Sequence, residues 1–396
     1  MGKGRERAED AGERERAFGH WLCRIEGIGR KTASRLLETA GSAEHIYNME
    51  EKLLAQSFKE AVVRRLLAAR EQKDVMEQYR LLSRRGIRYI PASDPEFPCR
   101  LRQIPDSPLG IYVLGRLPED GVPAAAVIGA RVCSEYGSHA ARQFTGALVR
   151  EGAHIISGLA RGIDGISQEE AVRRGGNTFA VLGCGVDVCY PVENRALYEK
   201  IRERGGILSE YPPGTPPRAG LFPQRNRLIS ALSDLILVIE AREKSGTLIT
   251  VDMALEQGKE VYAVPGRVTD GLSLGCNRLI AQGAGSALSP ETVAEALRRL
   301  TASRLRLQNA PLSVPSSKHR RAKDTEDTVP LLSEEDGSLK QAVLNRLDYA
   351  PATPSQIREK LAAAGTVLSL PELMQYLLEL SMEGRCAQTA GYFHRK

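Results

Sequence analysis

Arginines flank an asparagine in the segment FPQRNRLIS, residues 222–230. A guanidinium group is a rigid fork of donors that suits a phosphate or a carboxylate. Arg225 and Arg227 therefore require an anion. The segment alone leaves three anions open, namely a free nucleotide, the backbone of a nucleic acid and a buried acidic side chain.

Glycine-containing turns follow three apolar runs farther upstream, with the sequences VIGARVCSEYG, SGLARGIDG and VLGCGVDVCYP. Each turn places small residues where a backbone can approach a ligand, and each precedes a helical pattern whose first N–H groups favour an anion. Arg131 and Arg161 lie in two of these turns, and the later segment EAREKSGTLIT adds Lys244 and Thr247. If the preceding strands are parallel, all four residues meet at one edge of a sheet.

Other chemistry finds little support in the sequence. GCGVDV has Val188 in place of the third glycine of a dinucleotide-binding loop, and no G-x-x-x-x-G-K-[ST] loop occurs. The six histidines show no metal-ligand spacing, and the seven cysteines form no CxxC pair. We therefore expect no cofactor, no metal site and reduced cysteines.

The elements that must position these turns alternate between residues 85 and 300. Short β-rich runs, from IRYIP to KEVYAVPG, are separated by helical patterns at 135–149, 163–173, 194–203, 225–232 and 248–257. This alternation predicts an α/β fold, a Rossmann-like, doubly wound and mostly parallel sheet. Ligands in such folds bind beyond the carboxyl ends of the strands.

The flanking segments predict four further parts. Residues 1–17 alternate acids and bases and predict a disordered arm. Residues 18–84 predict a helical domain, residues 301–337 a flexible linker, and residues 338–396 three helices and a hairpin, which is typical of a winged helix.

The helical domain contains LCRIEGIGRKTASRLLETAG. Its glycine turn resembles a helix-hairpin-helix, or SAM-like, domain, in which Gly27, Gly29, Arg30 and Lys31 would make a secondary contact with DNA phosphate. An αα-hairpin that only packs on its neighbour explains the same pattern, and both interpretations stay open.

Six ordered segments between residues 91 and 288 resemble the DNA-processing protein DprA (Smf) family. They are SGLARGIDGISQEEA, LGCGVDVCYPVENRALYEKI, GGILSEYPPGTPP, FPQRNRLISALSDLILVIEA, SGTLITVDMALEQGKEVYAVPG and GCNRLIAQGA. The resemblance implies a protein that binds single-stranded DNA and loads the RecA recombinase onto it during natural transformation. It also implies a homodimer. The missing P-loop, and a missing carboxylate described below, further predict that the chain is not an enzyme.

The resemblance assigns site residues to this chain. Arg131 stands where the family has the arginine of a G-S-R turn, although Ala130 replaces the serine. The FPxRNR block is intact, Arg218 is the nearest basic residue before it, and a base would stack on Phe222 or on a neighbour such as Tyr211. The predicted DNA-binding residues are Gly129, Arg131, Gly158, Arg161, Gly162, Arg218, Phe222, Arg225, Asn226, Arg227, Lys244, Ser245, Gly246, Thr247 and Asn277.

One alternative concerns the two arginines of this block, because side chains two residues apart on a helix diverge. We expect at least one of Arg225 and Arg227 to be a structural clamp that pairs with an acid such as Glu210 or Asp234.

A second alternative is an enzyme or nucleotide-binding protein of the same Rossmann class. Nucleoside-monophosphate phosphoribohydrolases use a P-G-G-x-G-T-x-x-E motif, whose glutamate acts on an oxocarbenium-like centre. Here Thr250 stands at the position of that glutamate. A hydroxyl group cannot stabilise this charge, which favours the DNA-binding interpretation.

The overall charge and the termini bear on location and partners. The formal net charge is +6, which permits a polyanionic partner without requiring one. No apolar run is long enough to cross a bilayer, and the charged N-terminus is unlike a signal peptide. We therefore expect a cytoplasmic protein with no membrane contact.

Overall fold

The computed structural model describes most of the chain in two compact units, Met1–Leu312 and Ser313–Lys396. The described residues are 2–71, 74–309, 334–347, 354–363, 366, 368, 370–382, 385–389 and 392–395. Each unit is presented by itself.

A nine-stranded sheet forms the centre of the first unit, in the order β1-β2-β6-β5-β4-β3-β7-β8-β9. The strands β6, β5, β4, β3, β7, β8 and β9 are parallel to their neighbours. At one side of the sheet, β2 pairs antiparallel with β6, and β1 pairs antiparallel with β2. The strands are β1 Ile87–Pro91, β2 Gly110–Gly115, β3 Ala124–Ile128, β4 His154–Ser157, β5 Thr178–Val181, β6 Gly206–Ser209, β7 Leu235–Val238, β8 Glu260–Ala263 and β9 Gly285–Ser286.

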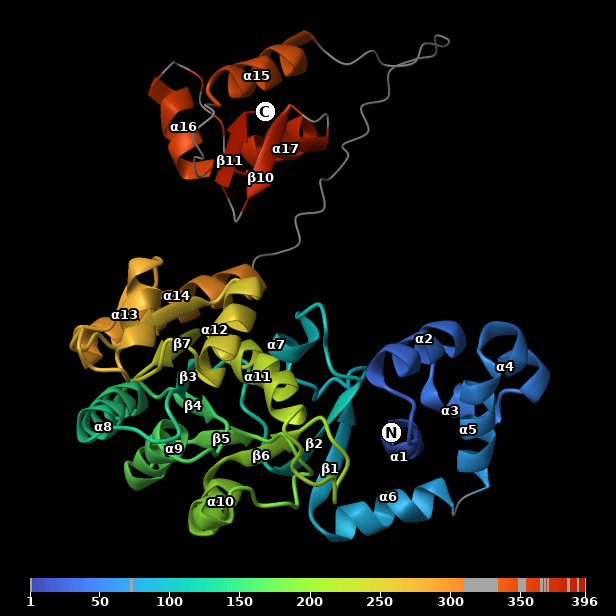
Figure 1. The fold of residues 1–396 in the computed structure, drawn as a ribbon. Coiled ribbons are helices and arrows are strands. Elements are labelled where there is room, and N and C mark those ends of the chain that lie inside the picture. The colour runs from blue at the N-terminus through green and yellow to red at the C-terminus, as the bar shows by residue number, and fades with distance from the viewer. Residues whose placement is uncertain are drawn as a thin grey trace, which may run out of the picture. The chain divides into compact units, whose positions relative to one another are not determined.

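Helices cover both faces of this sheet (Figure 1). Successive side chains of a strand point to opposite faces, so Ala125 and Val127 of β3 pack with one set of helices and Ala124 and Ala126 with the other. The first set is α8 Glu135–Arg150, α9 Ile163–Arg173 and α14 Pro290–Asn309, and the second is α7 Cys99–Arg102, α11 Leu221–Ala231, α12 Gly246–Glu256 and α13 Leu274–Ala281.

The predicted α/β sheet is confirmed, and the predicted β-rich runs from IRYIP to KEVYAVPG form strands β1 to β8. The two-residue strand β9 was not predicted, because so short a pairing leaves no periodicity. Helix α10, Arg195–Arg204, follows a short 3₁₀ turn at Val192–Asn194. Helix α11 begins at Leu221 rather than at residue 225. Pro223 fits its first turn, where a missing N–H breaks no helical hydrogen bond.

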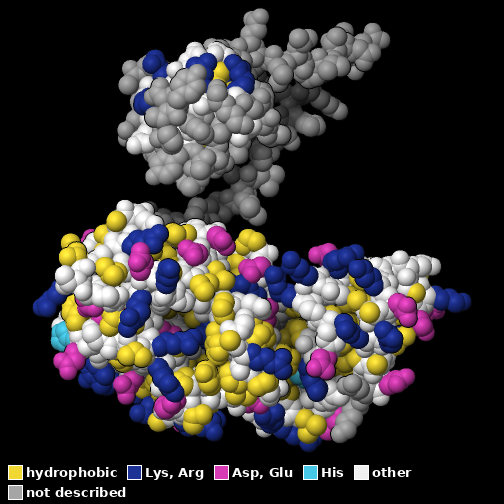
Figure 2. Space-filling model, in the orientation of Figure 1, with side chains coloured by type: hydrophobic (Ala, Val, Ile, Leu, Met, Phe, Trp, Pro, Cys, Tyr) yellow, Lys and Arg dark blue, Asp and Glu magenta, His cyan; other side chains and the backbone are white. Residues whose placement is uncertain are grey.

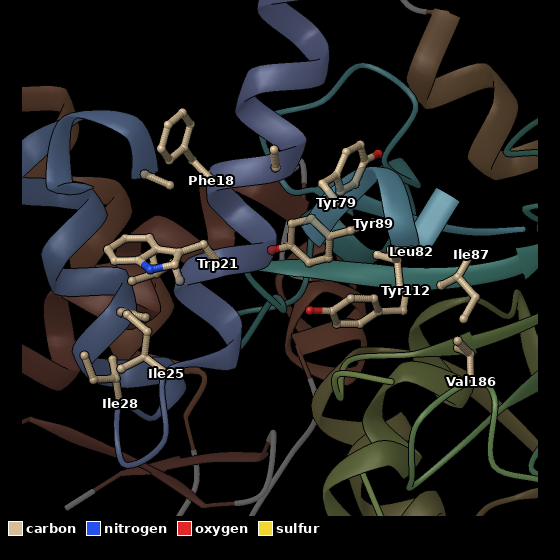
Figure 3. Packing of buried hydrophobic residues seen from close by; sticks show 14 of the residues in the cluster. Phe18, Trp21, Ile25, Ile28, Tyr79, Leu82, Ile87, Tyr89, Tyr112 and Val186 are labelled. Carbon is tan, nitrogen blue, oxygen red and sulfur yellow. The ribbon is translucent and has the colours of Figure 1, made fainter. Parts of the chain in front are cut away.

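Six helices precede the sheet and share a hydrophobic core with it. They are α1 Gly2–Arg24, α2 Arg30–Ala40, α3 Ala43–Asn48, α4 Glu51–Ser57, α5 Glu60–Arg70 and α6 Val75–Arg84. Figure 3 shows Tyr89 and Tyr112 on strands β1 and β2 next to α1, with Phe18 and Trp21 on α1 itself. Because this core is continuous, the helical part and the sheet form one unit.

The prediction of a disordered arm over residues 1–17 differs from the structure, in which α1 starts at Gly2. Its charged residues find partners on other segments: Arg14 pairs with Glu44, and Arg16 lies 2.7 Å from Asp94. Ala17 is fully buried. An alternation of acids and bases is therefore compatible with a helix when tertiary partners lie along its side.

The predicted linker of residues 301–337 also needs correction at both ends, and at its far end a helix already begins at Glu334. Helix α14 continues to Asn309, because Thr301 is buried and Arg304 lies 2.6 Å from the Asp234 carboxylate. Residues 310–333, the middle of the predicted linker, lie outside the described residues.

The second unit contains the predicted three helices and hairpin. They are α15 Glu334–Asn345, α16 Pro354–Ala363, α17 Leu370–Met382, β10 Cys386–Thr389 and β11 Tyr392–Arg395, with β10 and β11 antiparallel. Leu344, Ile357, Leu377 and Phe393 join these elements in one core. The winged-helix assignment stays a prediction. Among the helices of the described residues, none is long and apolar enough to span a bilayer.

Candidate nucleic-acid interface

A cavity of about 620 Å³ lies beyond the carboxyl ends of strands β3, β4 and β7. We call it the strand-end cavity. A smaller cavity of about 130 Å³ adjoins it, and the two share Arg131, Ala160, Tyr190, Phe222 and Arg225. The strand-end cavity is lined by residues 128–131, 160, 164, 190, 217, 219, 222, 223, 225, 226, 229, 245–247, 249 and 250. The structure thus brings the predicted turns together at one edge, as parallel strands require.

The turn after β4 packs tightly against the turn after β3. Gly162 has a φ of 69°, and a Cβ there would lie 2.2 Å from the carbonyl oxygen of Ala130. The same turn contains Leu159, which adopts a φ of 55°. This conformation costs on the order of 1–3 kcal/mol for a non-glycine residue. The Asn194 side chain holds it in place by donating to the Leu159 carbonyl at 2.9 Å.

Arg131 is exposed, and among the described residues it has no ion-pair partner. Its guanidinium lies 5.7 Å from the centroid of the Phe222 ring. Tyr190 stacks on the same ring with a centroid distance of 5.5 Å and an interplanar angle of 29°. An exposed cation that forms no ion pair with a described residue and two stacked aromatic rings therefore line one cavity.

Arg225 also lines the cavity, although its side chain is only 5% exposed. It donates to the carbonyl oxygens of Gly158, at 3.1 Å, and of Val181. Burial lowers the pKa of Arg225 to about 10, against the attraction of the Asp164 carboxylate. A Cβ at position 158 would lie 2.6 Å from this guanidinium, so the position of Arg225 requires a glycine there. Arg225 thus joins the ends of β4 and β5 and gives the cavity a positive charge.

The Arg227 side chain pairs with protein acids, as the structural-clamp alternative predicted for one of the two arginines. It is 6% exposed, and its guanidinium lies 2.8 Å from the Glu210 carboxylate and 2.6 Å from that of Asp106. Arg227 does not line either cavity. Because both of its anions are protein carboxylates, this geometry favours the structural clamp over the predicted DNA contact for Arg227.

The first turn of α12 forms another wall of the strand-end cavity. The Ser245 hydroxyl accepts a hydrogen bond from the Thr247 N–H at 3.1 Å, which caps the helix. Thr247 donates through Oγ1 to the Gly129 carbonyl at 3.2 Å, so it ties this turn to the turn after β3. Gly246 lies between them with open space around its Cα. These three predicted residues and Gly129 all line the cavity.

The remaining predicted residues lie at varying distances from the site. Arg161 lines the smaller cavity and pairs with Glu193. Arg218 and Lys244 are exposed and adjoin lining residues in the chain. Asn226 lines the strand-end cavity. Asn277 exchanges hydrogen bonds with the backbone of Gly266 and lines neither cavity.

The four residues of the glycine hairpin lie away from both cavities. The Gly27 carbonyl accepts a hydrogen bond from Arg65 at 2.8 Å, and Arg30 lies 4.0 Å from Asp106. Gly29 and Lys31 are exposed. Part of this turn is thus engaged in packing, while its role as a secondary DNA contact stays a prediction.

Asp164 is the one acidic residue among those that line the strand-end cavity. Its carboxylate accepts from the Gly158 N–H at 3.1 Å. Burial raises the pKa of Asp164, and the charge of Arg225 opposes this shift. Thr250, at the position of the phosphoribohydrolase glutamate, is buried and lines the same cavity.

Sequence reasoning missed Tyr190 as a site residue and named Tyr211 instead. Tyr211 is partly buried, and its hydroxyl donates to the Leu221 carbonyl at 3.4 Å. The available signal was the segment VCYP after the third glycine turn, which places an exposed aromatic residue near the carboxyl end of β5.

Comparisons with known proteins agree with this geometry. The profile of the DNA recombination-mediator protein A family matches residues 88–298. The Smf protein of Synechocystis sp. is 34% identical over 278 residues, covering 68% of this chain and 70% of that protein. The DNA processing protein DprA of Streptococcus pneumoniae is 41% identical over 200 residues, covering 50% of this chain and 71% of that protein.

A solved structure supports the same assignment. The X-ray structure of DNA processing protein A (DprA) from Streptococcus pneumoniae superimposes with a TM-score of 0.60 at 31% identity, covering 70% of this chain and 96% of that chain. The matched range 88–298 includes every strand from β2 to β9 and every residue that lines the strand-end cavity. With its turns, its FPxRNR helix and its sheet all in the matched region, the chain belongs to the DNA recombination-mediator protein A family, the family of the DNA-processing proteins DprA and Smf.

Proposed function

We propose that this chain binds single-stranded DNA in the strand-end cavity and delivers it to a RecA recombinase. The observation that carries the proposal is the position of Arg131, an exposed cation with no ion pair among the described residues, beside the stacked rings of Tyr190 and Phe222. A phosphate binds the guanidinium, and an unpaired base stacks on the rings. A duplex hides the faces of its bases, so this arrangement favours a single strand.

The overall charge contributes less to this binding than the local charge. Figure 2 shows lysine and arginine side chains spread over the face drawn, with aspartate and glutamate between them. Such a mixed surface attracts a polyanion weakly. Affinity therefore depends on the phosphate contacts at the cavity and falls steeply as salt is added.

A base-releasing hydrolase is the competing function, since it would use the same cavity. Its carboxylate would have to be Asp164, because Thr250 supplies only a hydroxyl. Asp164 is 8% exposed and is held by the Gly158 N–H, with the buried charge of Arg225 nearby. We therefore propose a binding protein without hydrolytic activity. Release of free base from nucleoside monophosphates, abolished by Thr250→Val or Asp164→Asn, would contradict this.

The decisive experiment compares matched single-stranded and duplex oligonucleotides by fluorescence anisotropy over a salt series, without added nucleotide. We expect tighter binding of the single strand at every salt concentration and a linear fall of log affinity with log salt. Equal binding of both oligonucleotides, or binding that is independent of salt, would reject the proposal.

Family membership supports two further parts of the proposal, assembly as a homodimer and contact with RecA in the cytoplasm. Light scattering of the purified chain tests the first part. RecA filament formation on single-stranded DNA coated with a single-strand-binding protein, measured with and without this chain, tests the second.

A further inference from the structure

Glu240 lies two residues after the end of β7 and forms hydrogen bonds with the turn that contains Arg131. Its side chain is fully buried, and no ion pair joins it to a described residue. A buried carboxylate without a cation is costly unless hydrogen bonds satisfy it. The hydrogen-bond donors of the Glu240 carboxylate therefore indicate the role of this residue.

Both ends of the Arg131 turn are attached to Glu240. At one end, the N–H of Ala130 donates to the Glu240 carbonyl oxygen at 2.8 Å. At the other end, the Glu240 carboxylate accepts from the Ser134 N–H at 3.0 Å and from the Ser134 hydroxyl. The residues between these two ends include Arg131 and Val132, which is 79% exposed. The turn is thus attached to Glu240 at both ends, while the side chains of Arg131 and Val132 between them are exposed.

The first turn of α8 is built around the same carboxylate. Ser134 caps α8 by accepting from the Gly137 N–H at 3.0 Å. A Cβ on Gly137 would lie 2.3 Å from the carboxyl group of Glu240. The positive end of the helix dipole also favours a carboxylate at this place. The sequence thus leaves room for the carboxylate and supplies its donors.

From this geometry we propose that Glu240 is the positioning residue that holds Arg131 at the strand-end cavity for its contact with DNA phosphate. Glu240 itself does not line the cavity. It acts through the hydrogen bonds that fix the turn. The inference rests on the proposed function, since Arg131 needs a phosphate to bind.

The test is a double-mutant cycle with Glu240→Gln and Arg131→Ala, read as the slope of log affinity for single-stranded DNA against log salt. Glutamine keeps the shape but turns an amide donor toward the donors of Ser134. We expect each single variant to lower the magnitude of the slope by about 0.7, the value for one phosphate contact on a single strand. The double variant should lose no more than either single variant, because both changes remove the same contact.

A second readout does not depend on DNA. Amide hydrogen exchange of residues 130–134 should be faster in Glu240→Gln than in the wild type, since the turn loses its attachment at Ser134. Glu170→Gln is the matched control: Glu170 is equally buried, and its carboxylate is held by Arg173, the last residue of α9, and by Arg174, which follows it. The control should leave both the slope and this exchange unchanged.

The outcomes separate the two proposals. If the wild-type chain fails to bind single-stranded DNA, the proposed function is wrong. If the wild type binds and a folded Glu240→Gln keeps the wild-type slope, or if the two single effects add, Glu240 does not position Arg131. Should Glu240→Gln fail to fold, Ser134→Ala replaces it in the cycle, because it removes the hydroxyl donor and keeps the buried carboxylate.

Discussion

Arginines lie at both edges of the central sheet, but the two edges differ in whether these arginines form ion pairs. At the amino edge, the Asp234 carboxylate lies 3.0 Å from Arg100 and 2.6 Å from Arg304. At the carboxyl edge, Arg131 has no ion-pair partner among the described residues and lies over Phe222. The comparison teaches that an arginine cluster indicates a ligand site only where the protein leaves a guanidinium without its own carboxylate.

The largest effect is expected at the amino edge. Asp234→Ala leaves two guanidinium groups without their buried counter-ion and should lower the free energy of unfolding by about 3–5 kcal/mol. Affinity of the folded protein for single-stranded DNA should stay at the wild-type value, because Asp234 lies at the opposite edge from the cavity. Urea unfolding and anisotropy measure the two quantities. A folded variant with wild-type stability would break the comparison.

A smaller effect is expected from the aromatic pair at the carboxyl edge. Tyr190→Ala should weaken binding of single-stranded DNA by roughly 1–3 kcal/mol, the range for one stacked base. The salt slope should not change, since no phosphate contact is lost. Tyr190→Phe should retain the affinity, and Tyr136→Ala, at an exposed tyrosine that does not line the cavity, serves as the control. Unchanged affinity in Tyr190→Ala would remove the ring pair from the site.

The amino edge also predicts a pH dependence of stability. Burial, together with the charges of Arg100 and Arg116, lowers the pKa of His154 to about 4. Below pH 6.5 the unfolded chain binds a proton at this histidine that the folded chain does not, so stability falls as the pH falls toward 4. At about pH 5 the loss is roughly 1–2 kcal/mol.

His154→Leu should abolish this part of the pH dependence. Urea unfolding at neutral and at acidic pH measures it for both proteins. Identical pH profiles for the wild type and the variant would show that His154 is protonated equally in the folded and unfolded chains.

Of these variants, Arg131→Ala should change the stability least, and its effect should be seen in the salt dependence of DNA binding. Because the side chain is exposed, the melting temperature should change little, while the slope of log affinity against log salt becomes shallower by about 0.7. Arg227→Ala is the matched control on the FPxRNR helix. It should keep the slope and lose about 3 kcal/mol of stability, since Glu210 is left without its cation. The reverse pattern would exchange the roles of the two arginines.

Much of the site was predictable from local sequence. The turns after β3 and β4, the FPxRNR helix and the start of α12 each follow a strand, and parallel strands bring their carboxyl ends to one edge. This argument predicts Arg131 and Thr247 at the edge, and the resemblance of the FPxRNR block adds Phe222. Tyr190 was not, because its ring reaches Phe222 through a long loop after β5 whose course no periodicity describes.

The sequence by itself determined the order of strands and helices, since the hydrophobic periodicity along each segment is a local property. It also determined which residue types follow each strand. Only the tertiary structure decided the direction of each charged side chain. Arg225 and Arg227 are neighbours on one helix, yet one lines the cavity and the other lies on Glu210 and Asp106. The partner of a charge is chosen by segments far apart in the chain, and that information appears only when the chain is folded.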